Sequence, residues 1–92
     1  MATEHGEMDS KAKEFLLQFS QAANRGILQP LDWRRFYAFT VYVHRQGLSI
    51  EAQDVQDVLT ANRWHKDRAG QLAERYEHSL DLLSYYDRVR SR

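Results

Sequence analysis

One stretch in the middle of the chain constrains the fold more than any other feature. Residues 32–46, DWRRFYAFTVYVHRQ, contain five aromatic residues and two valines. At about 100° per residue, the apolar side chains of a helix with this sequence cover a continuous arc of roughly 200°. Arg34, Arg35 and Arg45 occupy the remaining arc. An apolar arc this wide exceeds what one neighbouring helix covers, so the stretch predicts a central helix of an all-α fold.

The segment before this stretch predicts a first helix at residues 10–25. Apolar side chains recur there at helical spacing, and Asp9 or Ser10 is suited to accept hydrogen bonds as the N-cap. Gly26 predicts the end of the helix, because glycine readily takes the left-handed conformation of a C-terminal cap. Residues 1–9 are acidic and lack periodicity, so we expect a disordered, flexible N-terminal lead-in.

Pro30 separates the first helix from the central helix, and Gly47 ends the central helix. Pro30 is the only proline and disfavours helical geometry in the residue before it. We therefore expect the central helix at residues 32–46, with Asp32 as its N-cap. Gly47 predicts its C-terminal end, in the same way as Gly26 predicts the end of the first helix.

Two more helices are predicted after Gly47, at residues 49–61 and 66–89, with Ser49 as the cap of the first of them. The last helix spans roughly 36 Å at 1.5 Å per residue, so we expect its final turn to project beyond the others. Its predicted core stripe is Ala69, Leu72, Ala73, Tyr76, Leu80, Leu83 and Tyr86. Short connections favour antiparallel neighbours, so residues 10–92 predict one compact four-helix bundle domain.

Composition excludes several classes of protein. The 92 residues include no cysteine, which excludes disulfide frameworks and cysteine-ligated metals formed by this chain alone. No stretch has the apolar length of a transmembrane helix, and the polar N-terminus does not resemble a signal peptide. We therefore expect a small soluble cytoplasmic domain that does not bind membranes. Its motifs are generic helix caps and apolar stripes, and they identify no family.

Candidate metal and catalytic groups are sparse. Glu74 and His78 lie four residues apart, a spacing that ligands use in helical-bundle metal sites, but the apolar stripe of the first helix offers no matching ligand. Nucleophilic catalysis needs a serine or cysteine beside a histidine and a carboxylate, whereas the serines here occupy cap, helix or terminal positions. We predict a protein that is not an enzyme and has no metal, cofactor or small-molecule substrate.

Basic clusters provide an alternative function, that of a nucleic-acid-binding regulator. These basic residues are Lys11, Lys13, Arg34, Arg35, Arg88, Arg90 and Arg92. Gly47 also stands where helix-turn-helix motifs place their turn, but the following helix carries Glu51, Asp54 and Asp57, which repel phosphates. Thirteen basic and thirteen acidic residues give a net charge of zero, so the whole molecule has no general attraction to nucleic acid.

Aromatic residues beyond the needs of the core provide the main functional hypothesis. Consecutive Tyr85 and Tyr86 point about 100° apart on a helix, so only one of them joins the core. Leu82, Tyr85 and Val89 recur at the spacing of a helix-pair or helix-in-groove contact. We predict a regulator, inhibitor or adaptor that binds a protein partner or a second copy of itself. The predicted binding residues are Trp64, Leu82, Tyr85, Tyr86, Arg88, Val89 and Arg90.

Overall fold

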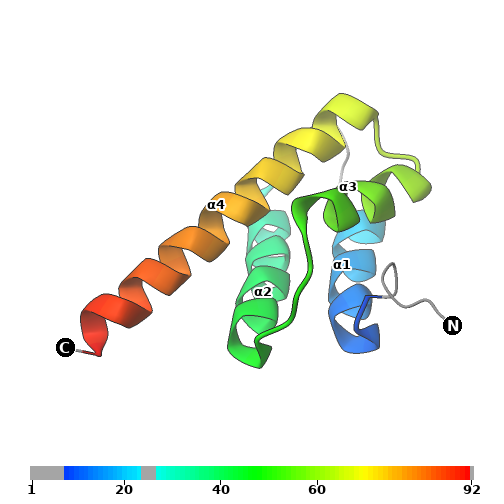
Figure 1. Ribbon diagram of the computed structural model, residues 1–92. Coiled ribbons are helices and arrows are strands. Elements are labelled where there is room, and N and C mark those ends of the chain that lie inside the picture. Colours follow the sequence, from blue (N-terminus) through cyan, green and yellow to red (C-terminus); the bar gives the residue numbers. More distant parts are fainter. Residues whose placement is uncertain (1–7, 24–26, 92) are drawn as a thin grey trace, which may run out of the picture.

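The computed structural model describes residues 8–23 and 27–91, and these residues form an all-α bundle without strands, as the sequence predicted (Figure 1). Its four helices are α1 (Ser10–Ala22), α2 (Pro30–Gln46), α3 (Ala52–Ala61) and α4 (Lys66–Arg90). Helix α1 packs on α2 and α3, and α4 packs on the same two helices from the other side. The central helix α2 therefore contacts both α1 and α4, consistent with its wide apolar arc.

Helix α1 begins where it was predicted but ends earlier. The amide of Ala12 donates to a carboxylate oxygen of Asp9 at 3.1 Å, so Asp9 is the N-cap. The predicted end at residue 25 is wrong, because Ala23 already has extended backbone angles. The predicted Gly26 cap lies outside the described residues, as does most of the predicted lead-in, residues 1–7.

The predicted N-caps of α2 and α3 are wrong, because in both helices an aspartate binds the cap amide from inside the first turn. Pro30 does not precede α2 but forms its first turn, where a missing N–H costs no helical hydrogen bond. Asp32 lies one turn inside and accepts a hydrogen bond of 2.8 Å from the amide of Gln29, the residue that caps the helix. Glu51, not Ser49, caps α3, and its amide is bound in the same way by an aspartate three residues later. In both helices the acidic residue contributes to the cap from inside the first turn.

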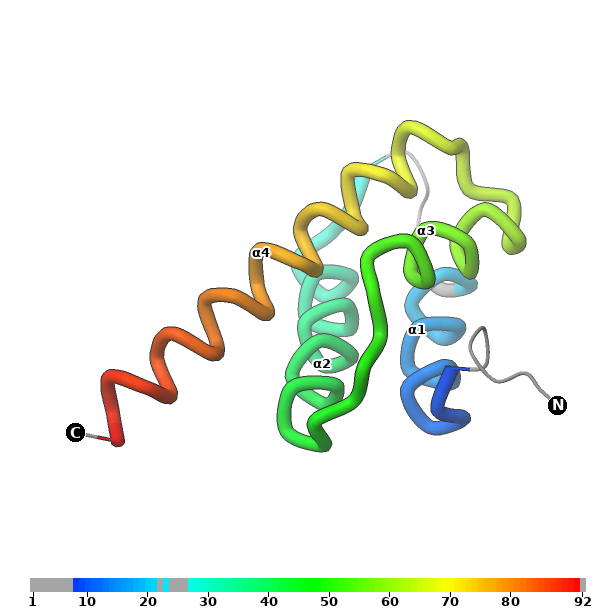
Figure 2. The backbone as a smooth tube through the Cα atoms, viewed as in Figure 1, coloured from blue at the N-terminus to red at the C-terminus, as the bar shows by residue number. Residues whose placement is uncertain are grey.

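Gly47 ends α2 as predicted, with the left-handed angles φ 64° and ψ 36°. The chain then runs back along α2 to the start of α3 (Figure 2). This return segment brings Ile50 against α4, where its carbonyl accepts a hydrogen bond from the hydroxyl of Tyr76 at 2.5 Å. The hydroxyl is therefore satisfied within the core, and desolvation by burial raises the pKa of Tyr76 well above its ordinary value.

Aromatic rings from three helices form the centre of the core. The ring of Phe36 in α2 lies 5.0 Å from that of Phe19 in α1, and Phe39 lies 5.4 Å from Tyr76 in α4. Trp64, in the corner between α3 and α4, stacks on Phe19 at 5.5 Å. All five side chains are buried. The aromatic residues of α2 thus join α1 to α4.

Helix α4 is buried only along its N-terminal half. Its buried residues end at Tyr76, and Leu80 and Leu83 are half-buried. The predicted core position of Tyr86 is wrong, because this side chain is 55% exposed. Figure 1 shows the reason: the C-terminal half of α4, drawn from orange to red, extends past the other helices. Within the described ranges, no helix combines the length and apolar character needed to cross a membrane.

Candidate partner-binding surface

Four large apolar side chains form an exposed strip on the C-terminal half of α4. These residues, which we call the α4 strip, are Leu82, Tyr85, Tyr86 and Val89. Their exposed fractions are 41%, 52%, 55% and 48%, respectively. Helical geometry places the four within an arc of about 100°, on the side of α4 that faces away from the buried Tyr76. The two tyrosine rings also pack edge to face, with centroids 5.6 Å apart.

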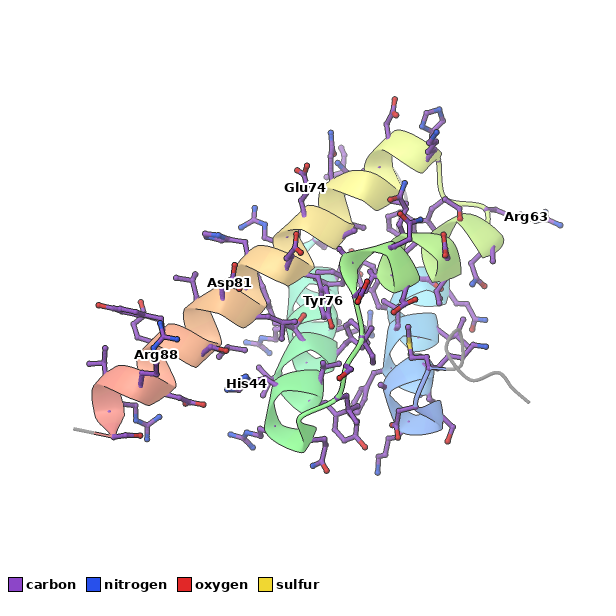
Figure 3. The ribbon with its side chains drawn as sticks, in the orientation of Figure 1. His44, Arg63, Glu74, Tyr76, Asp81 and Arg88 are labelled. Atoms are coloured by element: carbon purple, nitrogen blue, oxygen red, sulfur yellow. The ribbon has the colours of Figure 1, made fainter. Side chains whose placement is uncertain are left out.

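Two polar contacts between α2 and α4 set the direction in which the strip faces. Near the end of both helices, Nε2 of His44 lies 2.6 Å from Oδ2 of Asp87. Figure 3 shows His44 extending from α2 toward this part of α4. Three turns earlier, the guanidinium of Arg75 lies 5.2 Å from the ring centroid of Trp33, which is cation–π distance. These contacts limit rotation of α4 about its axis, so the strip points to solvent.

An apolar groove adjoins the strip where α4 crosses α2. This α2–α4 groove has a volume of about 380 Å³ and is lined mainly by apolar groups. Tyr37 and Val41 form its α2 side, and Leu82 and Tyr86 of the strip form part of its α4 side. Tyr37 is 36% exposed, so it extends the apolar surface from α4 onto α2. Strip and groove therefore form one continuous surface.

A second hollow lies on the opposite side of α4 and has a different chemical character. It has a volume of about 600 Å³ between the start of α3 and the middle of α4. Glu51, Glu77 and Asp81 line it together with Ile50 and Leu80. Carboxylates attract metal ions only when several converge, and no group of three or more potential ligands converges anywhere in the described part of the chain.

The structure gathers six of the seven predicted binding residues at one end of the molecule. The strip residues, Arg88 and Arg90 are all exposed on the last turns of α4. Trp64 is different, because it is only 3% exposed and its indole N–H donates to the carbonyl of Ser20 at 3.2 Å. It belongs to the core at the opposite end of α4 and is not available to a partner.

Sequence reasoning missed the contribution of α2 to the surface. Tyr37 and Val41 belong to the wide apolar arc of residues 32–46, and a central helix predicts that neighbouring helices cover this arc. They lie at one edge of that arc, and α4 crosses α2 without covering them fully. Their position at the edge of an unusually wide arc was the available signal, since the edges are the last part that neighbouring helices cover.

Comparison with known proteins identifies no relative: no family model, no curated protein and no solved structure matches this chain. The geometry of the strip and the groove is therefore the basis for inferring a function.

Proposed function

We propose that this protein is a small non-catalytic protein-interaction module that binds its partner through the α4 strip and the α2–α4 groove. The observation that carries the proposal is the strip itself, in which four large apolar side chains are 41–55% exposed on adjacent turns. Exposed apolar patches of several hundred Å² mark interaction sites on soluble proteins. Tyrosine is also among the residue types that contribute most to binding free energy at protein interfaces.

The chemistry of the surface favours a protein partner over a small molecule. Small-molecule sites enclose most of the ligand and orient it with converging polar groups. The groove here is open and mostly apolar, and the adjoining strip protrudes instead of forming a cavity. A protruding apolar helix face matches the helix-in-groove and helix-pair modes of protein recognition. Exposed Arg88 and Arg90 lie at its rim, where charges set orientation and partner choice more than affinity.

Within this proposal, we assign the protein the role of a regulator, inhibitor or adaptor. Such proteins act by occupying a partner surface, and this requires no reactive group. The proposed cytoplasmic location remains a prediction from composition.

The test is an affinity capture from extracts of the native cells, comparing three versions of the protein. Tyr85→Ala/Val89→Ala removes the centre of the strip, and Ser84→Ala is the matched control on another exposed face of the same turns. Substitutions at exposed positions typically change stability by about 0.5 kcal/mol or less, so circular dichroism should show all three versions folded. We expect the double variant to lose a captured protein, or self-association, that wild type and Ser84→Ala retain. Unchanged capture and unchanged mass in the double variant would contradict the proposal.

The alternative function, nucleic-acid binding, has weaker support in the geometry. Lys11 and Lys13 lie on α1 and Arg88 lies on α4, and the backbones of these two helices do not pack against each other. On α2, Arg35 lies 3.6 Å from Asp32, which neutralises part of its charge. A mobility-shift titration on DNA and RNA at two salt concentrations separates the functions, because phosphate contacts weaken steeply with salt whereas apolar protein contacts do not.

A further inference from the structure

We propose that the α4 strip binds a second copy of this chain, with the two α4 helices packed antiparallel and Asp81 of each copy facing Arg88 of the other. This inference rests on the proposed function, because it names the partner of the same surface. It draws on three features of α4: the spacing of its outward residues, the positions of its charges and its exposed area.

The outward residues of α4 follow a heptad pattern. Leu82, Tyr85 and Val89 are separated by three and then four residues. This is the a/d spacing by which one helix packs along another. The core-facing residues of α4 occupy a different side of the helix, since they include the buried Leu72 and Tyr76. Helix α4 therefore carries an outward seam beside its buried one, and Tyr85 and Val89 on the outward seam are about half exposed.

Charges beside the outward seam favour an antiparallel pair. Asp81 and Arg88 are seven residues apart, and each immediately precedes a seam residue, so both lie on the same flank of the seam. In an antiparallel pair the same flanks of the two helices meet, and each Asp81 then approaches the Arg88 of the other copy. In a parallel pair this flank meets the opposite one, where Ser79 and Tyr86 supply no charge. Flanking charges of this kind select orientation in paired helices.

Both charged side chains are available for such contacts. Asp81 and Arg88 are exposed, and in the described part of the chain neither forms an ion pair. Figure 3 shows both on the half of α4 that extends past the other helices. Antiparallel packing aligned on Leu82 and the partner's Tyr85 creates two identical Asp81–Arg88 contacts, because the arrangement has twofold symmetry.

The exposed area is compatible with a weak dimer. The strip and Tyr37, with exposed fractions of 36–55%, present on the order of 400 Å² of side-chain surface per chain. A standard stable interface buries about 800 Å² per partner. The strip therefore supplies about half of that area, and the charged flank and the rim of the groove supply more. We expect a dimer that dissociates in the micromolar range.

The first experiment measures mass against concentration for the full chain by sedimentation equilibrium, from about 1 µM to about 1 mM. We expect wild type to change from one chain to two, Tyr85→Ala/Val89→Ala to remain a monomer and Ser84→Ala to behave as wild type. A wild-type monomer over the whole range would overturn the inference. The proposed function would still hold in that case if wild type captures another protein from the extract and Tyr85→Ala/Val89→Ala does not.

The second experiment tests the antiparallel arrangement by exchanging charges. Asp81→Arg alone places two arginines together at both contacts, and Arg88→Asp alone places two aspartates together, so each should weaken the dimer about tenfold. An equimolar mixture of the two variants restores both attractions and should form heterodimers, as should the double exchange Asp81→Arg/Arg88→Asp with itself. Circular dichroism of each variant checks the fold. If a mixture dimerises no better than either variant alone, the antiparallel pairing is wrong.

Discussion

Replacing Phe36 by alanine tests whether the aromatic cluster on α2 is the energetic centre of the fold. The Phe36 side chain is fully buried, and its ring has neighbours on both sides, with Phe19 at 5.0 Å and Phe39 at 6.2 Å. Truncation removes the transfer free energy of a buried aromatic ring, about 2 kcal/mol. It also leaves a cavity of about 100 Å³, which costs about 2 kcal/mol more at roughly 24 cal/mol per Å³.

The expected loss in the free energy of unfolding is therefore about 3–5 kcal/mol, a large share of the 5–15 kcal/mol typical of a small domain. Urea denaturation followed by circular dichroism measures this loss. If the slope of the unfolding free energy against urea concentration is unchanged, the folded and unfolded states of the variant are as compact as those of wild type. Tyr37→Ala is the matched control, because the neighbouring Tyr37 is 36% exposed and its truncation leaves no closed cavity. A Phe36→Ala variant within about 1 kcal/mol of wild type would refute the assignment of the core.

Two further predictions concern buried polar groups. Trp64→Phe removes the hydrogen bond from the indole N–H to the carbonyl of Ser20. We expect the free energy of unfolding, measured by urea denaturation, to fall by about 1–3 kcal/mol. An unchanged free energy of unfolding would show that this hydrogen bond contributes nothing to stability. Burial raises the pKa of Tyr76 above its ordinary value of 10.0, so above about pH 10 the unfolded state loses this proton while the folded state keeps it. Stability should then fall by about 1.4 kcal/mol per pH unit, and Tyr76→Phe should show a shallower fall; equal slopes would contradict the prediction.

The sequence by itself determined which segments of this protein are helical, because amphipathic periodicity and turn residues are local signals. The stretch around Phe36 has helical spacing throughout, and Gly47 takes the left-handed angles expected of it. The number of helices follows from such signals, since each apolar stripe ends at a glycine, a proline or a polar corner.

The helix starts were less predictable, because several residues in a first turn have the chemistry of a cap. Asp32 and Ser49 are both favoured N-cap types, yet α2 begins before Asp32 and α3 begins after Ser49. At a helix start, the cap side chain can accept a hydrogen bond from the amide three residues later. A carboxylate three residues inside the helix can equally accept one from the amide of the cap residue. The choice between these arrangements depends on where the connecting segments place the helix ends.

Only the tertiary structure decided which aromatic residues are buried. Trp64, in a polar corner, fits over Phe19, whereas Tyr86, on the continuation of a core stripe, is exposed. Periodicity determines which side chains share a face of a helix, but the lengths and crossing of the other helices determine how much of that face they cover. The buried residues of α4 end at Tyr76, and after this point α2 contacts one side of α4 and leaves the α4 strip exposed on another.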